Sequence, residues 1–228
     1  MDTTLISLGV AAIVVVVLYF MFRNGPPAFL TPSVGVTSVV TDGRKTFDSK
    51  LALPRSLNEK EGIAFSYTCW VKVDDWNYRY GAQKVIFTKG PTDLSSSCPA
   101  LLLDGNTNSM LVKVDTFGAT EVIPISNIPA KKWIHIAIAI NQDAVDVYVN
   151  AILHTHHTLA QLPRQNDDTV HTGIDGGFEG KIASVEYYNR FLSPSDVKAS
   201  MKSSPQTDPE DAFGAVPPYF DITWWTRS

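Results

Sequence analysis

Short segments of alternating apolar and polar residues fill the chain between residues 35 and 203, and clusters of Gly, Pro, Asn and Asp separate them. A period of two residues is typical of a β-strand with one buried face. The pattern predicts strands at residues 63–73, 84–88, 100–103, 110–114, 133–140, 144–150 and 181–188. Many short strands with turns at this spacing predict an all-β fold, a sandwich of two antiparallel sheets.

Three of these segments indicate which side chains should be buried. Residues 63–73 carry an apolar face made of Phe65, Tyr67, Cys69 and Val71, and residues 133–140 carry one made of Ile134, Ile136, Ile138 and Ile140. In residues 181–188, Ile182 and Val185 fall near opposite faces. That spacing predicts a strand that is covered on both sides.

Two connections are predicted from their turn residues. Residues 104–108 read Asp-Gly-Asn-Thr-Asn, a composition that favours a hairpin turn. The strand at residues 144–150 is followed by Ala151, where a two-residue turn prefers glycine. Because alanine resists a positive φ, we expect a longer turn or another turn type there.

The N-terminus predicts a transmembrane helix. Residues 5–22, with Leu5, Ile13, Val16 and Phe22 among them, contain no charge and no proline. At the helical rise this stretch spans about 27 Å, close to the thickness of a bilayer's hydrocarbon core. A cleaved signal peptide and a buried core helix are the alternatives. The first four residues lack Lys and Arg, and the residues after Phe22 are a poor cleavage context, so a retained anchor is preferred.

The orientation of this anchor rests on one charge. Arg23 is the only basic residue near either end of the apolar stretch, and the positive-inside rule then places the large domain in the cytosol. The chain contains no N-x-[ST] glycosylation site, which agrees with that side. We therefore expect a single-pass membrane protein.

The remaining chain divides into three parts. Residues 23–34 contain three prolines and are expected to form a stiff linker before the domain at residues 35–203. A short helix is expected at residues 193–201, since Ser193, Pro194 and Asp196 suit the N-cap, N1 and N3 positions. The tail at residues 204–228 ends with Trp224 and Trp225, which we expect to pack on the domain or on a partner.

Composition and charge limit the classes of function. The 228 residues are 44% hydrophobic and 18% charged, which predicts a folded core. The net charge of -4 provides no basic excess for phosphates, so nucleic-acid binding is not expected. Cys69 and Cys98 are not in a C-x-x-C pair, and whether they form a disulfide is left open by the sequence.

Several motifs together resemble a known family. Residues 177–194 (GFEGKIASVEYYNRFLSP), 127–135 (NIPAKKWIH), 145–150 (VDVYVN) and 61–71 (EGIAFSYTCWV) resemble laminin-G-like, concanavalin A-like jelly rolls. The resemblance covers about residues 35–203 and implies a two-sheet jelly-roll sandwich. Such families often have Asn-Gly where this chain has Asn150 and Ala151.

A narrower resemblance concerns the whole arrangement. The anchor, the domain, the CPALLLD run at residues 98–104 and the terminal PPY…WW resemble membrane-anchored proteins of large algal and amoebal DNA viruses. That resemblance implies a minor capsid protein in the virion, which would link an internal membrane to the shell.

Catalytic chemistry is not indicated. Glycoside hydrolases of the laminarinase-like group carry E-x-D-x-x-E on one strand, and no such run occurs here. The acidic residues near predicted strands, Asp104, Asp115, Asp146 and Glu186, occur singly. The sequence therefore predicts a protein that is not an enzyme.

Two partial metal motifs are present. Asp104, Asn106, Asn108 and Asp115 mimic part of a calcium loop, and laminin-G domains sometimes hold calcium at the sandwich rim. On a strand, His154 and His156 face one way and could share a metal, with His171 from a neighbouring loop as the third ligand. An Asx-rich turn and a polar edge explain these residues more simply. We expect no cofactor, with calcium the weaker alternative.

The leading functional prediction is a non-catalytic, membrane-anchored structural or interaction protein that binds other structural proteins, such as capsid proteins. The alternative is a carbohydrate-binding, lectin-like module displayed on a membrane. Trp76, Tyr78 and Tyr80 are the candidate glycan or protein contacts in the domain, and Trp224 and Trp225 are candidate partner contacts in the tail.

Overall fold

The computed structural model describes residues 34–37, 39–56, 58–59, 62–203 and 205. The predicted anchor with Leu5, Ile13, Val16 and Phe22 lies outside these residues, as do nearly all of the linker and the tail that carries Trp224 and Trp225. Over the described ranges, none of the helices has the length and apolar character needed to cross a membrane.

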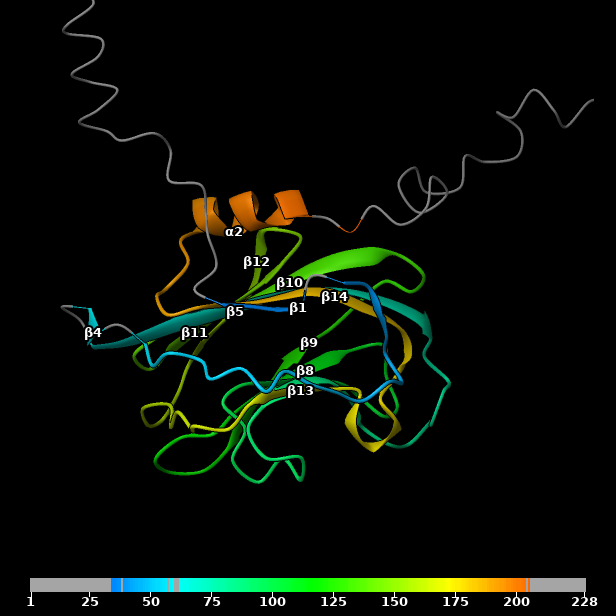
Figure 1. The fold of residues 1–228 in the computed structure, drawn as a ribbon, viewed down its shortest axis with the longest axis horizontal. Helices are drawn as coiled ribbons and strands as arrows, with labels where there is room; N and C mark the ends of the chain where they lie inside the picture. The colour runs from blue at the N-terminus through cyan, green and yellow to red at the C-terminus, as the bar shows by residue number, and fades with distance from the viewer. Residues whose placement is uncertain (1–33, 38, 57, 60–61, 204, 206–228) are drawn as a thin grey trace, which may run out of the picture. The chain divides into compact units, whose positions relative to one another are not determined.

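The described chain folds as two antiparallel sheets, which confirms the predicted sandwich (Figure 1). Sheet A contains eight strands, β1 (Val34–Thr37), β2 (Thr41–Asp42), β4 (Asn58–Glu59), β5 (Gly62–Asp75), β10 (Trp133–Asn141), β11 (Ala144–Val149), β12 (Ile152–Thr158) and β14 (Glu179–Tyr188). Sheet B contains six strands, β3 (Phe47–Asp48), β6 (Lys84–Lys89), β7 (Ala100–Leu103), β8 (Met110–Val114), β9 (Glu121–Ile125) and β13 (Val170–Thr172).

The order of strands places the longest ones in the centre of sheet A. That order is β1-β14-β5-β10-β11-β12, with β2 on β14 and β4 on β5, while sheet B runs β3-β13-β6-β7-β8-β9. β12 and β9 are therefore edge strands, one in each sheet.

The core lies between the sheets and follows the predicted faces. Phe65, Tyr67, Cys69 and Val71 of β5 lie in one buried cluster, and so do Ile134, Ile136, Ile138 and Ile140 of β10. Their partners in sheet B include Phe87 of β6 and Leu101 of β7. Burying each large apolar side chain contributes about 1.5–3 kcal/mol, so this cluster is the main stabilising element.

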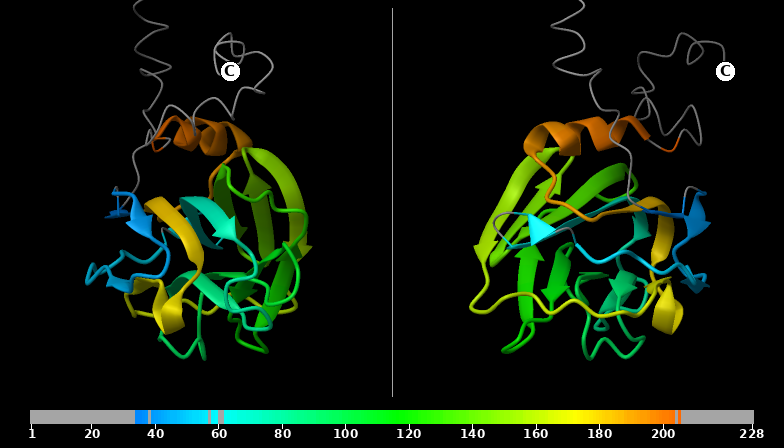
Figure 2. Two further views of the ribbon diagram at one scale, coloured as in Figure 1. Left: turned by 90° about the vertical axis from the view of Figure 1, so that its right-hand side faces the viewer. Right: turned by 60° about the vertical axis from the view of Figure 1, so that its left-hand side comes forward.

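A short helix covers the outer face of sheet A. α2 (Pro194–Ser200) begins after the N-cap Ser193, which forms a capping box with Asp196, as the sequence predicted. Figures 1 and 2 show α2 on the side of sheet A that faces away from sheet B. Ser200 lies 3.2 Å from Nε2 of the buried His135 in β10, so the helix closes over this ring.

One predicted face is corrected by a bulge. The pairing of β14 with β5 shifts register between Ala183 and Glu186, and Ser184 has a φ of 47°. Because of this extra residue, Ile182 and Val185 both face the central core and do not lie on opposite faces. The strand is still covered on both sides, because Ala183 on it is also fully buried.

The turn after β11 is also corrected. β11 and β12 are joined by Asn150 and Ala151 alone, and their φ angles are 50° and 60°. This is the two-residue geometry that Asn-Gly normally supplies. The Asn150 side chain accepts a hydrogen bond from the His135 backbone N–H at 2.9 Å, which holds the turn against β10 despite the alanine.

Candidate functional site

β6 connects the two ends of the sandwich and carries a buried lysine at each end. Lys84 is 0% exposed and Lys89 is 6% exposed. We name the loops around Lys84 the aromatic rim (residues 75–82, 104–109 and 174–179). The loops around Lys89 form the clamped rim (residues 90–98, 115–120 and 159–169). Burial lowers the pKa of both amines.

Lys84 organises the aromatic rim. Its Nζ donates hydrogen bonds to the carbonyl oxygens of Trp76 at 3.3 Å and Tyr78 at 3.0 Å. The Tyr78 hydroxyl donates to the carbonyl of Gly176 in η1 (Ile174–Gly176) at 3.1 Å. Gly81 N–H donates to the Gly105 carbonyl at 2.9 Å, so this loop is also fixed to the β7–β8 hairpin.

The three predicted contact aromatics have different environments. Trp76 is partly buried and packs against the central core. Tyr78 is half-buried and held by its hydroxyl. Tyr80 is 69% exposed. The rim therefore presents one exposed ring on a loop that hydrogen bonds fix, and does not form an exposed coplanar pair.

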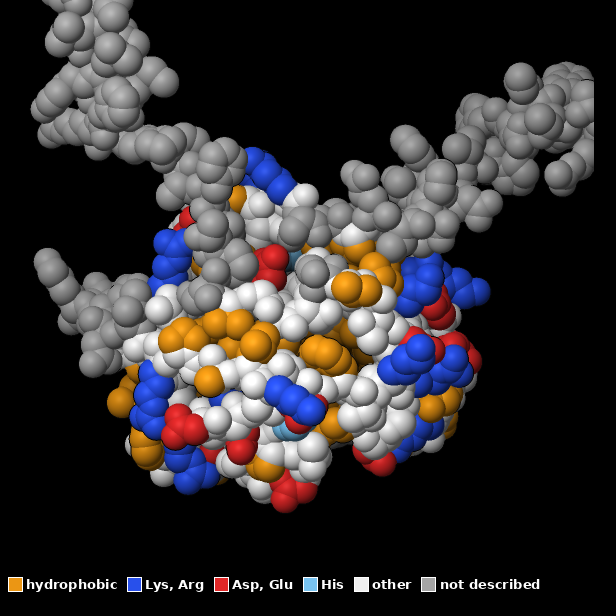
Figure 3. Space-filling view, viewed as in Figure 1, with side chains coloured by type: hydrophobic (Ala, Val, Ile, Leu, Met, Phe, Trp, Pro, Cys, Tyr) orange, Lys and Arg blue, Asp and Glu red, His pale blue; other side chains and the backbone are white. Residues whose placement is uncertain are grey.

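A groove of about 430 Å³ lies beside this rim. Its lining includes Val40, Asp42, Arg44, Asp74, Glu179 and Lys181. Arg44 pairs with Asp42 at 3.4 Å and with Glu179 at 3.1 Å. The backbone N–H and guanidinium of Arg44 lower the pKa of the Asp42 carboxyl. Figure 3 shows acidic and basic side chains interspersed over the face in view.

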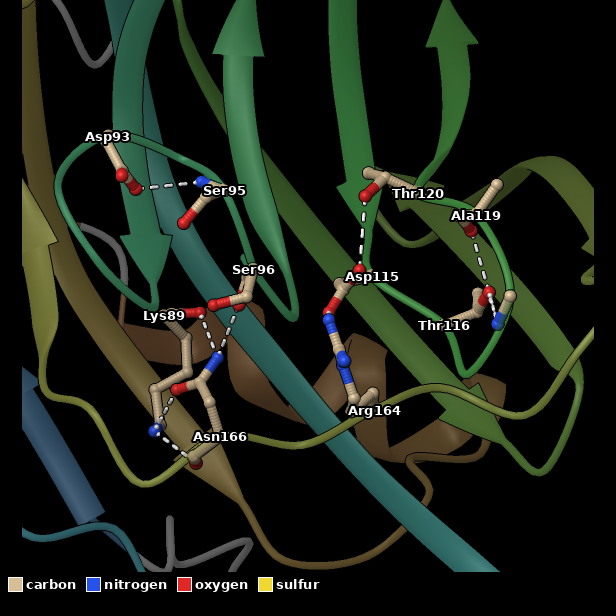
Figure 4. Close-up of polar contacts among 11 residues, drawn as sticks. Lys89, Asp93, Ser95, Ser96, Asp115, Thr116, Ala119, Thr120, Arg164 and Asn166 are labelled. Atoms are coloured by element: carbon tan, nitrogen blue, oxygen red, sulfur yellow. Dashed lines mark hydrogen bonds and ion pairs between the residues drawn. The ribbon is translucent and has the colours of Figure 1, made fainter.

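Lys89 holds the clamped rim more tightly (Figure 4). Its Nζ donates to the Asn166 carbonyl at 2.8 Å, to Asn166 Oδ1 at 3.0 Å and to the Asp168 carbonyl. Asn166 Nδ2 donates in return to the carbonyls of Lys89 at 3.0 Å and Ser96 at 2.8 Å. These reciprocal bonds tie three separated segments together.

The residues proposed for calcium are not brought together. Asp104 follows β7 at the aromatic rim, where it accepts hydrogen bonds from Thr107 Oγ1 at 2.6 Å and from the Asn106 and Thr107 backbone. Asp115 follows β8 at the clamped rim, where it is 3% exposed and paired with Arg164 Nη2 at 2.7 Å. β8 separates Asp104 from Asp115, so the four residues are not brought to one loop, and Asn106 and Asn108 lie in the turn that Asp104 begins.

The histidines also lie apart from their expected third ligand. His154 and His156 lie on β12 in sheet A, whereas His171 lies on β13 in sheet B, 3.7 Å from Asp48. Across the described part of the chain, no group of three His, Cys, Asp or Glu side chains is placed to hold a metal. His171 is therefore not placed beside His154 and His156 as a third ligand.

The two cysteines are separate buried thiols. Neither Cys69 nor Cys98 is bonded, which answers the disulfide question left open by the sequence. Burial raises the pKa of the Cys69 thiol far above its usual range and that of Cys98 to about 12. Both thiols therefore stay protonated and unreactive at neutral pH.

Sequence reasoning missed the residues that build the two rims. Lys84 and Lys89 bound the run KVIFTK, which contains Val85, Ile86 and Phe87, and a lysine at each end of a mostly apolar strand was the available signal. Asp42, Asp74 and Glu179 come from separate strands, so only the fold brings them to one groove.

Comparison with known proteins gives a consistent picture. The Laminin_G_3 family, described as the concanavalin A-like lectin/glucanases superfamily, matches residues 44–198. No curated protein matches the chain.

Solved structures match at low sequence identity. The botulinum neurotoxin serotype D binding domain has a TM-score of 0.58 at 12% identity, covering 76% of this chain and 51% of that chain. The receptor-binding domain of the C/D mosaic serotype has a TM-score of 0.53 at 15% identity, covering 62% and 36%. The chain thus spans about a third to a half of these proteins, and the likeness concerns the fold alone.

Proposed function

Because the chain belongs to the concanavalin A-like lectin/glucanases superfamily, we propose that it is a non-catalytic binding domain whose aromatic rim recognises another protein. The fold itself hosts both lectins and hydrolases, so the proposal must rest on the site. The observation that carries it is Tyr80, which is 69% exposed on a loop fixed by hydrogen bonds.

A fixed exposed tyrosine suits protein recognition. Tyrosine supplies a large contact area and loses little side-chain entropy on binding, and it is enriched at interface hot spots. Arg44, Asp42 and Glu179 in the neighbouring groove offer charges of both signs. Such a rim is polar, as interface rims generally are.

Two carboxyl groups, Asp104 and Glu121, lack the pKa shift that acid catalysis needs. The pKa of Asp104 is lowered by the Thr107 hydroxyl, and that of Glu121 is lowered by His157. A general acid in a glycosidase needs the opposite shift, toward a protonated carboxyl at neutral pH. These groups accept hydrogen bonds in the folded protein and are poor proton donors.

We further propose that residues 5–22 hold the domain at a membrane, with the domain on the cytosolic side. In a virion, this arrangement would link an internal membrane to the capsid shell. The support for both is the apolar run without charges, the single Arg23 beside it and the resemblance to viral membrane-anchored proteins.

Crosslinking and mass spectrometry on the full-length protein in its native membrane or particle tests the proposal. We expect crosslinks to a partner protein from residues near Tyr80, and their loss in Tyr80→Ala. The matched control is Phe117→Ala, because Phe117 is an equally exposed aromatic, 71%, at the clamped rim. If only Phe117→Ala lost the crosslinks, the binding surface would be the clamped rim. If the wild-type chain gave no crosslinks, protein binding would be rejected.

Carbohydrate binding is the second candidate function. Tyr80 lies at the rim beside a groove whose carboxylates could accept hydrogen bonds from sugar hydroxyls. A glycan array with the wild-type chain and Tyr80→Ala separates the two. Binding of a glycan that Tyr80→Ala abolishes, without protein crosslinks, would favour the lectin.

A further inference from the structure

Two neighbouring loops of the clamped rim present an exposed surface without charge. Thr116 and Pro163 form a β-bridge, and the Phe117 N–H donates to the Leu162 carbonyl at 3.0 Å, so the loops lie side by side. Phe117 is 71% exposed and Leu162 is 46% exposed. We name residues 117–119 and 160–162 the uncharged tip, because all of them are exposed and none is charged.

The two acidic residues that flank the tip are held by bonds within the chain. Asp115 is 3% exposed, pairs with Arg164 Nη2 at 2.7 Å and accepts a hydrogen bond from Thr120 Oγ1 at 3.1 Å. Glu121 lies 2.7 Å from the His157 ring and accepts a hydrogen bond from the Ala160 N–H at 2.7 Å. A paired carboxylate costs less to bring near an apolar phase than a free one.

The backbone of the tip is also satisfied in large part. Thr116 Oγ1 donates to the Ala119 carbonyl at 2.7 Å and accepts from the Gly118 N–H at 3.0 Å (Figure 4). The Phe117 N–H, the Leu162 carbonyl and the Ala160 N–H are bonded as described above. Unpaired backbone groups are costly where water is excluded, so these bonds suit the tip to an apolar environment.

The described chain begins at the same end of the sandwich as the tip. Val34 of β1 pairs with Tyr187, and Tyr187 lines the small pocket beside Lys89 together with Asn166. Residues 23–33 separate Val34 from the apolar run at residues 5–22 and can span about 36–40 Å when extended. The clamped rim therefore lies at the end where the chain continues to the proposed anchor.

We propose that the uncharged tip inserts Phe117 and Leu162 into the interface of the membrane that holds the anchor, an inference that rests on the anchor proposed above. A lipid surface is favoured over a protein at this rim because the tip offers apolar side chains and no charge for a partner to match. The aromatic rim lies at the opposite end of β6 and offers charges of both signs. A domain that is seated on its clamped rim leaves Tyr80 available to a partner protein.

The test uses the full-length chain in vesicles of phosphatidylcholine, a lipid without net charge. A polarity-sensitive fluorescent reporter is attached at Ala119→Cys in the tip or, in a second sample, at Asn106→Cys in the aromatic rim. Cys69 and Cys98 are buried, so they do not take up the reporter. We expect lipids with a nitroxide on the acyl chain to quench the reporter at position 119. Iodide in solution should quench the one at position 106.

Variants assign the insertion to the two side chains. Phe117→Ala and Leu162→Ala, each measured with the reporter at position 119, should lower the ratio of inserted to free tips about tenfold, because each loses buried apolar area. Val39→Ala is the matched control, because Val39 is 69% exposed between β1 and β2. High salt should leave insertion unchanged, since the contact uses no charge.

Flotation of the vesicles after an alkaline wash tests the anchor separately. A chain that floats while the reporter at position 119 stays in water would overturn the insertion and keep the anchor. A chain that the wash removes would overturn the anchor and the docking inferred from it. Equal loss of insertion in Val39→Ala, or insertion that requires anionic lipid, would also overturn the proposal. Thermal unfolding checks that the variants are folded, as expected for exposed positions.

Discussion

Both ends of β6 carry a buried lysine that donates hydrogen bonds to the surrounding loop, but the two rims around these lysines differ. Lys84 donates hydrogen bonds to two loop carbonyls. Lys89 donates to two loop carbonyls and also to the side-chain amide oxygen of Asn166. At the clamped rim, a pocket beside Lys89 has a volume of about 10 Å³, room for one water molecule. At the aromatic rim, a groove and Tyr80 stay open.

The two rims differ in what the lysine hydrogen bonds hold. Asn166 donates hydrogen bonds back to the Lys89 carbonyl and to Ser96, so contacts within the chain hold the backbone of the clamped rim. The bonds of Lys84 hold only the backbone of its loop, which leaves the side chain of Tyr80 outward. We infer that the clamped rim serves the fold and the aromatic rim serves recognition.

Removing the clamp gives the largest expected effect. Lys89→Met keeps the apolar stem but leaves the Asn166 and Asp168 carbonyls without their donor. Unpaired buried polar groups cost about 1–3 kcal/mol each, so we expect a loss of about 3 kcal/mol in the free energy of unfolding. Urea denaturation measures it, with the exposed Lys132→Met as the control. A loss below that of Lys84→Met would contradict the comparison.

Acid should weaken the fold nearly as much without acting on either rim. Burial under α2 lowers the pKa of His135 to about 4, below the usual histidine value of about 6.5. Between these values the unfolded chain binds more protons, so stability is full above pH ~6.5 and falls toward pH ~4 by about 3 kcal/mol. Urea denaturation from pH 7 to 4 checks this.

Substitution of His135 tests whether this residue causes the change in the free energy of unfolding with pH. His135→Gln should lower stability at pH 7 but flatten the slope between pH 6.5 and 4. An unchanged slope in this variant would assign the acid sensitivity to another group.

Loosening the aromatic rim should cost less. Lys84→Met removes hydrogen bonds of 3.3 and 3.0 Å to two carbonyls. We expect a loss of about 2 kcal/mol, together with faster amide hydrogen exchange confined to residues 76–82. Exchange that spreads to residues 159–169 would show that the two rims are coupled.

The turn at the β11–β12 connection provides a smaller, opposite change. Ala151 holds a φ of 60°, which costs an L-residue about 1–2 kcal/mol. Glycine removes that cost but loses more entropy on folding, so Ala151→Gly should stabilise by about 0.5–1 kcal/mol. Thermal unfolding measures this change. A destabilised variant would mean that the alanine methyl makes a favourable contact.

The sequence predicted what depends on local periodicity. Residues 63–73 and 133–140 alternate regularly, and their faces were right because the two strands pair with each other without interruption in the centre of sheet A. Ile182 and Val185 were misplaced because a bulge at Ser184 breaks the period of two. β9 was not predicted, because Pro124 interrupts its pattern. β12 was considered only as a strand carrying His154 and His156, because its polar residues hide the alternation.

The candidate site was predicted only in part, for a related reason. Trp76, Tyr78 and Tyr80 were identified by type, but only the hydrogen bonds of Lys84 and Tyr78 decide that Tyr80 alone is exposed. A lysine in a sequence predicts a solvent-exposed position, so the sequence does not predict a buried lysine that donates to loop carbonyls. Asp104 and Asp115 were grouped by spacing, although an extended strand separates residues that a loop would bring together.

The smallest expected change in stability is also the most direct test of recognition. Tyr80→Ala removes an exposed ring, and such surface substitutions usually change stability by less than about 0.5 kcal/mol. A tyrosine hot spot contributes about 2 kcal/mol to binding, so partner affinity should fall about 30-fold. Phe117→Ala at the clamped rim should change neither quantity, although its ring is as exposed. Equal losses of affinity in both variants would mean that the two rims do not differ in function, and unchanged affinity in Tyr80→Ala would reject the aromatic rim as the binding surface.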